Sequence, residues 1–184
     1  MTGPTRPGND LSLADAAEIQ SVGIDDLSSV RYIHATSLRM LAASQLTEAE
    51  IAAVADYVYA GAYSRALAEA VRSKQMIGAW IGPDLVGTAG WSPADDSGAT
   101  ARIWGVSVLP LFRRAGLGHR LVTGAENDAR RAGFSAFALR STSNATGFFA
   151  QLGYEISSHG VWALTPEVSL PVAFLRKVQP VADA

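Results

Sequence analysis

The sequence contains no cysteine among its 184 residues. This absence excludes disulfide bonds, catalysis by a thiolate and zinc bound through cysteine. Any chemistry that the protein performs must therefore use other side chains or the backbone.

Long apolar runs and an excess of charge of one sign are also missing. No uninterrupted apolar stretch approaches the roughly 20 residues of a membrane span, and the N-terminal MTGPTRPGND lacks the apolar region of a signal peptide. The 15 Lys and Arg residues nearly balance 17 Asp and Glu residues, giving a net charge of −2, whereas a nucleic-acid binder shows a basic stripe. We therefore expect a cytoplasmic protein with no nucleic-acid or membrane partner.

Apolar residues are plentiful. They make up 48% of the chain against 17% charged residues, which is enough to build a packed core. The length fits one domain. Residues 1–15 hold two prolines, two glycines and little that could pack, so we expect a flexible N-terminal tail followed by a single domain over residues 16–180.

Hydrophobic spacing and turn residues predict the order of helices and strands. A capping box at Thr47 and Glu50, for example, marks the start of one helix, and Gly133 marks the end of another. The expected elements are a strand at 18–22, helices at 25–43, 47–59 and 64–72, strands at 76–81, 85–91 and 101–108, a helix at 118–132, a strand at 134–139, a helix at 144–152, and strands at 154–163 and 170–178. This order predicts an α+β domain of three layers, in which helices cover both faces of a mixed, mostly antiparallel twisted sheet.

One segment, from Val106 to Gly118, runs from a strand through a glycine-bearing turn into a helix. The free N–H groups at a helix N-terminus attract anions, and Arg113 adds a permanent charge suited to phosphate, so a pyrophosphate is a natural ligand. Gly116 and Gly118 would let the backbone approach it, although they could also serve only a tight turn. The segment does not match the P-loop, which needs G-x-x-x-x-G-K-[ST]. It does not match the dinucleotide fingerprint G-x-G-x-x-G either, because Leu121 occupies the position of the last glycine.

Two motifs resemble those of the GNAT superfamily of N-acetyltransferases. Val108-Leu-Pro110 followed by Arg113-x-x-Gly116-x-Gly118 is similar to the acyl-CoA signature of that family. The string from Ser143 to Tyr154 is similar to its N-A-x-x-F-Y-x-x-L-G-[FY] element. The resemblance covers about residues 17 to 178 and implies a GNAT-like fold.

The resemblance implies acetyl-CoA as co-substrate and no metal. The Arg113 side chain and the turn amides would hold the pyrophosphate, while the pantetheine arm would lie beside a strand that separates from its parallel neighbour, with Gly105 as a bulge residue. The implied cofactor-binding residues are Val106, Ser107, Val108, Arg113, Arg114, Ala115, Gly116, Leu117, Gly118, His119, Asn144, Phe148 and Phe149.

The implied reaction is direct attack of a primary amine, expected to belong to a small molecule, on the thioester within a ternary complex. The sequence departs from the family pattern in two ways. Phe149 replaces the tyrosine that often protonates the departing thiolate, and residues 102–108 contain no carboxylate to act as a base. Ser107 and His159, acting through water, are the candidate catalytic substitutes.

Other residues have simpler interpretations. His34 is expected to be packed or to cap, His119 to contribute its amide, and His159 to be a turn residue. Asp95 and Asp96 are expected to be solvated, and Trp104 to lie nearest the acceptor. Tyr57, Tyr59 and Tyr63 would rim the acceptor site or simply pack.

The two departures keep a second function open, that of a non-catalytic acyl-CoA-binding or sensing module. The identity of the acceptor and the choice of acyl group also stay open, as does the oligomeric state, for which a homodimer is one candidate.

Overall fold

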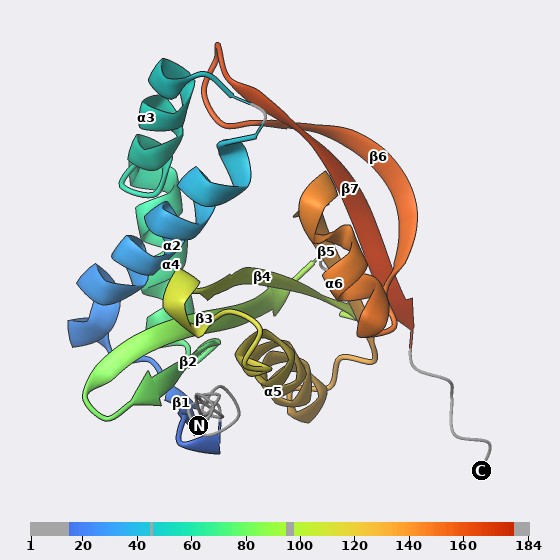
Figure 1. The fold of residues 1–184 in the computed structure, drawn as a ribbon. Coiled ribbons are helices and arrows are strands. Elements are labelled where there is room, and N and C mark those ends of the chain that lie inside the picture. The colour runs from blue at the N-terminus through green and yellow to red at the C-terminus, as the bar shows by residue number, and fades with distance from the viewer. Residues whose placement is uncertain (1–14, 45, 95–97, 179–184) are drawn as a thin grey trace, which may run out of the picture.

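A seven-stranded sheet with the order β1-β2-β3-β4-β5-β7-β6 forms the centre of the protein (Figure 1). The computed structural model describes residues 15–44, 46–94 and 98–178. The strands are β1 (Glu18–Ser21), β2 (Met76–Ile81), β3 (Asp84–Pro93), β4 (Thr100–Val108), β5 (Ala136–Thr142), β6 (Glu155–Ala163) and β7 (Ser169–Val178). The helices are α2 (Leu27–Ala42), α3 (Glu48–Tyr57), α4 (Gly61–Arg72), α5 (Leu117–Arg131) and α6 (Thr146–Gln151), with short 3₁₀ turns at Ile24–Asp26, Pro110–Phe112 and Ser143–Ala145.

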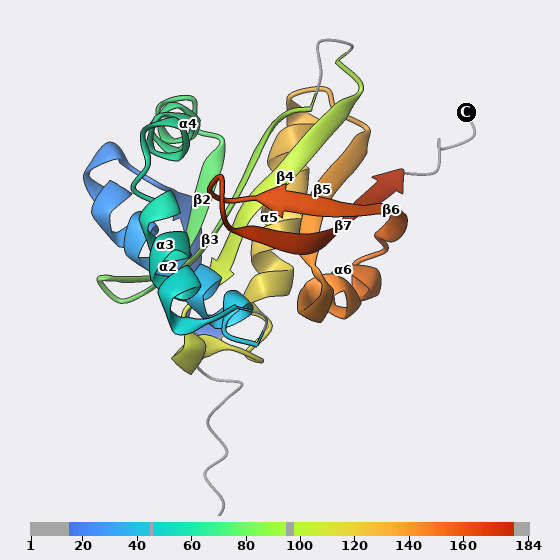
Figure 2. The same ribbon diagram turned by 90° about the horizontal axis from the view of Figure 1, so that it is seen from above.

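Helices cover both faces of the sheet, which confirms the predicted three layers (Figures 1 and 2). On one face, α5 buries Leu121, Val122 and Ala125 against strand residues that include Ala89 and Phe137. On the other face, α2 and α4 form a second core with Met76 of β2, to which they contribute Val30, Ile33 and Leu67. Burial of these apolar side chains stabilises the layers.

Local signals account for most element boundaries. The capping box at the start of α3 is present, with the Glu50 amide donating to Thr47 Oγ1 at 3.4 Å and the Thr47 amide donating to the Glu50 carboxylate at 2.8 Å. Differences from the expected ranges are small. The first long helix begins with a 3₁₀ turn, and β5 extends from Ala136 to Thr142 rather than over 134–139. The expected tail lies almost entirely outside the described residues.

Strands β4 and β5 are the parallel pair that α5 connects, and their pairing is short. Three residue pairs join them, the last being Arg102 with Ala138. The remaining residues of β4 continue beside β3, while β5 continues beside β7. The two strands therefore separate in the middle of the sheet.

The β6–β7 hairpin arches from this opening toward the other helices (Figure 1). Leu164, Val168 and Leu170 at its tip pack against Leu38 of α2 and Val58, just after α3. The hairpin and α2 thus flank the opening between β4 and β5. Among the described residues, no helix is long and apolar enough to cross a membrane.

Candidate active site

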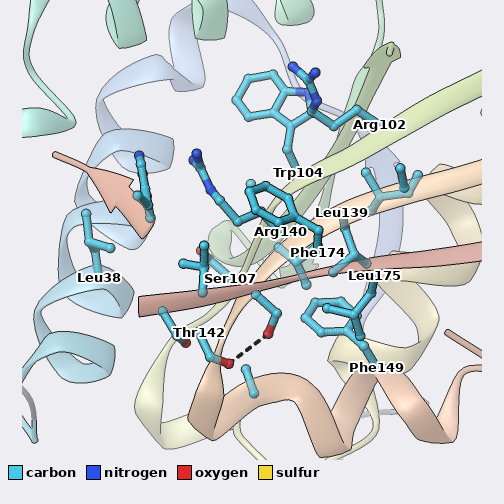
Figure 3. Close-up of a pocket in the computed structure, with 18 of the residues that line it drawn as sticks. Leu38, Arg102, Trp104, Ser107, Leu139, Arg140, Thr142, Phe149, Phe174 and Leu175 are labelled. Atoms are coloured by element: carbon cyan, nitrogen blue, oxygen red, sulfur yellow. Dashed lines mark hydrogen bonds between the residues drawn. The ribbon is translucent and has the colours of Figure 1, made fainter. Parts of the chain in front are cut away.

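A cavity of about 540 Å³ lies at the separation of β4 and β5. Its lining comes from both strands, from α2, α4 and α6, and from the β6–β7 hairpin. Arg102 and Trp104 of β4 lie on one side of the cavity in Figure 3, and Phe149 of α6 lies on the opposite side. The cavity therefore joins the part of the fold near α6 to the face of the sheet that α2 and α4 partly cover.

A bulge in β4 shapes this cavity. Thr88 and Gly90 of β3 pair with Ser107 and Trp104, so two residues of β4, Gly105 and Val106, lie opposite a single residue of β3. Gly105 has a φ of +62°, which residues with a Cβ rarely adopt. The bulge predicted at Gly105 is confirmed. It bends β4 where no strand pairs with its other edge, and an extended ligand could add to that edge as a strand does.

The turn that precedes α5 presents free backbone amides. Gly116, with a φ of +76°, is the N-cap of α5 and offers no side-chain acceptor, and the first turn of the helix contains no acidic residue. The first helical amides, those of Leu117, Gly118 and His119, have no partner one turn earlier within the helix. Their partial positive charge makes the turn suitable for an anion such as a pyrophosphate.

The α6 segment lies against this turn. A Cβ added to Gly118 would be 3.1 Å from Phe148, so close packing of the two helices is a second reason for glycine here. Phe149 is buried, lines the cavity and packs edge-on against Phe148 with ring centroids 4.9 Å apart. Asn144 accepts a hydrogen bond at Oδ1 from Thr142 Oγ1 at 2.7 Å. The ring of Phe149 brings no proton donor to the cavity.

His34 of α2 forms the centre of a buried hydrogen-bond chain. Its Nδ1 lies 2.6 Å from the Tyr63 hydroxyl, and its Nε2 lies 2.8 Å from Thr88 Oγ1. Thr88 uses its only proton on the Gly105 carbonyl at 2.8 Å, so it must accept from Nε2–H. Nδ1 is then unprotonated and accepts a hydrogen bond from the Tyr63 hydroxyl.

The electrostatics of this chain follow from its burial. Burial lowers the pKa of His34 to about 4, an effect that the nearby Gly105 carbonyl partly offsets, so His34 is neutral at pH 7. Burial also raises the pKa of Tyr63 above its ordinary value, and a neighbouring phenol, Tyr57, adds to that increase. The chain is thus neutral, with its tyrosine end in the cavity lining.

The cavity lining is rich in arginine. It includes Arg102, Arg140 and Arg176 but no aspartate or glutamate among the described residues. The guanidinium of Arg140 lies over the ring of Trp162, 3.8 Å from its centroid. Burial lowers the pKa of Arg140, the Tyr57 side chain raises it, and the charge of Arg102 lowers it further.

The structure places the predicted site residues in several parts of the fold. Val108 is the last residue of β4, Asn144 lies in the 3₁₀ turn before α6 and Phe148 lies in α6, and these three are not part of the cavity lining. Val106, Ser107 and Phe149 line the cavity, as Trp104 does, while the turn from Arg113 to His119 lies at the N-terminus of α5. His159 is exposed on β6 and is not part of the cavity lining. Asp95 and Asp96 lie outside the described residues. His34 is packed as expected, but the sequence interpretation did not include its bonds to Tyr63 and Thr88, which join residues 29 and 54 positions away.

Arg140 and Trp162 were also missed as a pair. An alternating pattern on β5 places Arg140 on the same face as Ala138, and a cation beside an aromatic strand is the signal that could have found it. Among the described residues no group of three His, Asp or Glu side chains could hold a metal ion.

Comparison with known proteins adds to this geometry. The structure resembles the PaiA N-acetyltransferase from Thermoplasma acidophilum in complex with coenzyme A, with a TM-score of 0.71 and 17% identity over 89% of this chain and 99% of that one. It also resembles YncA from Salmonella typhimurium with its cofactor acetyl-CoA, with a TM-score of 0.66 and 14% identity over 91% and 96% of the two chains. At these identities the likeness shows the fold.

A shorter sequence match links the chain to YyaT of Bacillus subtilis (strain 168), which is 36% identical over 61 residues. That match covers 33% of this chain and 41% of YyaT. The model of the acetyltransferase (GNAT) family matches residues 40–154, a range that contains β4, the turn before α5 and all of α6. With the fold, the separated strands and this match in agreement, the chain belongs to the GNAT family of acetyltransferases.

Proposed function

We propose that the protein is an acetyl-CoA-dependent N-acetyltransferase that moves an acetyl group to a primary amine of a small molecule. The observation that carries this proposal is the separation of β4 and β5 beside the free amides of the α5 turn. The bound coenzyme A of PaiA and the acetyl-CoA of YncA support the choice of cofactor.

In this proposal the cofactor lies along two backbone features. The amides from Arg114 to His119, with the Arg113 side chain, hold the pyrophosphate. The pantetheine arm extends along β4 beside Val106, Ser107 and Val108, with Asn144, Phe148 and Phe149 on its other side. No metal takes part, because the reaction needs only an oriented amine and a thioester.

The reaction forms a C–N bond and breaks the C–S bond of the thioester. The amine lone pair attacks the carbonyl carbon, a β4 amide stabilises the developing oxyanion, and the thiolate leaves. Orientation within the ternary complex lowers the barrier. Because Phe149 has no hydroxyl, the thiolate takes its proton from water or from the acceptor ammonium.

The amine must lose a proton before or during the attack. Since an alkylammonium titrates near 10.4, deprotonation at neutral pH costs about 4–5 kcal/mol. Formation of the C–N bond makes the attacking nitrogen much more acidic, and Tyr63, in the cavity lining, can accept the proton at its oxygen at that stage as its own proton passes to Nδ1 of His34. Ser107, also in the lining, is the alternative proton acceptor. His159 has no such support, because it lies on the exposed strand β6.

The absence of a carboxylate from the described lining and the presence of Phe149 favour one alternative, an acyl-CoA-binding module without turnover. Cytoplasmic location, the lack of nucleic-acid and membrane partners, and a homodimer stay predictions.

Calorimetric titration with acetyl-CoA tests the cofactor site without knowledge of the acceptor. We expect micromolar binding that Arg113→Glu weakens at least tenfold and that Arg72→Glu, a matched charge reversal at an exposed residue of α4, leaves unchanged. Absence of binding in the wild type overturns the proposal. Release of the coenzyme A thiol over many turnovers with any amine then excludes the non-catalytic alternative.

A further inference from the structure

Three arginines lie on the face of the sheet opposite to the face that α5 covers. Arg102 of β4 is paired in register with Ala138 of β5, which in turn is paired with Arg176 of β7. Arg140 lies two residues after Ala138 and therefore on the same face. Three neighbouring strands thus direct arginines to one side of the sheet, and all three residues line the cavity.

These arginines have no acidic partner within the described structure. The ion pairs found there involve Arg72, Arg130, Arg131 and Lys177, and none involves the cavity arginines. Arg176 lies opposite Glu155 in the β6–β7 register, without an ion pair. Arg140 and Arg102 have no carboxylate opposite them in the sheet, so they are the cations left to face the cavity.

Arg140 is exposed, and its guanidinium is stacked on an aromatic ring. Its guanidinium stacks on Trp162 at 3.8 Å, and Trp162 packs edge-on against Tyr57 with centroids 5.4 Å apart. Stacking fixes the plane of the guanidinium, and a side-chain hydrogen bond joins it to Tyr57. Its remaining N–H groups are the kind that bind a carboxylate in two parallel hydrogen bonds. An ordered cation of this kind is suited to recognise an anion rather than to add solubility.

The same cavity contains further unused polar atoms. Ser37 Oγ and Trp104 Nε1 are buried without a hydrogen-bond partner in the described structure, and both residues belong to the lining. A buried donor without a partner costs free energy, which an oxygen-bearing ligand can offset. Leu38, Phe174 and the aromatic rings supply the apolar remainder of the wall.

From this arrangement we infer that the acceptor is an amine that also carries a carboxylate, as an amino acid does, and that Arg140, assisted by Arg102, binds that carboxylate. The inference rests on the proposed function and specifies its acceptor class. Arg140 acts in binding, while Tyr63, in the same lining, is available to the amine. The positive charges also disfavour polyamines and basic peptides, since a second cation on the acceptor would be repelled.

The test compares matched acceptors at saturating acetyl-CoA. The panel is the twenty common L-amino acids, the amide and the decarboxylated amine of each, phosphoethanolamine with ethanolamine, and spermidine. The readout is release of the coenzyme A thiol. We expect at least one amino acid to exceed its amide and its decarboxylated amine at least tenfold in kcat/KM. Phosphoethanolamine separates a carboxylate preference from a general preference for anions.

Variants then assign the effect to Arg140. Arg140→Gln should lower kcat/KM for the preferred amino acid about 10- to 100-fold, mainly through KM, while the amide changes less than about threefold. Arg140→Lys keeps the positive charge but lacks the planar guanidinium that can donate two parallel hydrogen bonds. Its kcat/KM for the preferred amino acid should lie between the values of Arg140→Gln and the wild type. Arg72→Gln is the matched surface control. Unchanged acetyl-CoA affinity and thermal unfolding show that the cofactor site and the fold are intact.

A second readout does not require turnover. Tryptophan fluorescence, to which Trp162 and Trp104 of the cavity lining contribute, is titrated with the same amino acids in the wild type and in Arg140→Gln. Saturable change in the wild type alone supports the inference. No binding of any amino acid, equal use of acids and amides, or a preference for spermidine overturns it. Failure to bind acetyl-CoA overturns instead the proposed function, so the two failures are distinguishable.

Discussion

The Nδ1 atom of His34 lies 2.6 Å from the hydroxyl oxygen of Tyr63, so a side chain of α2 accepts a hydrogen bond from a side chain of α4. On its other side His34 is linked through Thr88 to the carbonyl of Gly105 in the bulge of β4. The helical layer and the strand that we assign to the cofactor are therefore joined by one chain of hydrogen bonds, and several predictions depend on it.

The free energy of unfolding should decrease when the pH is lowered, because His34 is buried in its neutral form. The side chain is buried, and its pKa is about 4 in the folded protein against about 6.5 when unfolded. Between these values the unfolded chain binds a proton that the native protein does not bind. The free energy of unfolding should thus be fully maintained above pH 6.5 and decrease by about 3 kcal/mol as pH falls to 4.

Denaturant unfolding of the wild type and of His34→Gln at pH 4 to 8 measures this effect. Glutamine can donate and accept at similar positions but does not titrate. The difference in stability between the two proteins should narrow as pH falls below 6.5. A constant difference across the range would show that His34 keeps an ordinary pKa.

Tyr63→Phe should lower kcat about 100-fold and leave acetyl-CoA affinity unchanged, because it removes the oxygen that we propose accepts the amine proton. The pH dependence of kcat should change in the same variant. Tyr59→Phe is the matched control, since Tyr59 is 57% exposed and does not line the cavity. Full activity in Tyr63→Phe would transfer the role to Ser107, for which Ser107→Ala is the next variant.

Phe149→Tyr should retain or increase turnover by up to about tenfold, because the new hydroxyl would stand where it can protonate the leaving thiolate. The ring already lines the cavity and packs on Tyr154 with centroids 5.9 Å apart, so the fold should accept the added oxygen. Steady-state kinetics with acetyl-CoA and the preferred acceptor measure the change. A loss of turnover with unchanged cofactor binding would contradict our account of the thiol end of the site.

His119→Glu should affect stability and cofactor binding in opposite directions. The residue is exposed in the first turn of α5, where a negative charge interacts favourably with the helix dipole, and the unliganded protein should gain about 0.5 kcal/mol. The same charge repels a pyrophosphate at the turn and should weaken acetyl-CoA binding at least tenfold. Thermal unfolding and calorimetry measure the two effects. A variant that binds as well as the wild type would place the pyrophosphate elsewhere.

Local chemistry explains which features could be predicted from the sequence. The capping box at Thr47 and the turn from Arg113 to Gly118 depend on residues close in sequence, so their structural meaning is visible in the chain. The bulge at Gly105 was expected from the resemblance to the family and is confirmed by its backbone angle. These features define the fold and the candidate cofactor site.

The acceptor side of the cavity could not be predicted in the same way. His34 and Tyr63 lie on different helices, and Arg140 of β5 contacts Trp162 of β6 although β7, which follows both in the sequence, lies between these strands in the sheet. Each residue alone fits a packed or solvated position. Their chemistry appears only when the sheet brings β5, β6 and the helical layer together, which one sequence without its fold does not specify.

The separation of β4 and β5 has a consequence for the evolution of sequence and specificity in proteins with this fold. A recognition surface that consists of main-chain amides and the gap between two strands depends on the path of the backbone, and many side chains are compatible with that path. The wall formed by Arg140, Trp162 and Tyr63 consists instead of side chains. Substitutions there can alter the choice of acceptor while the donor is retained, which is consistent with a shared fold at 17% identity.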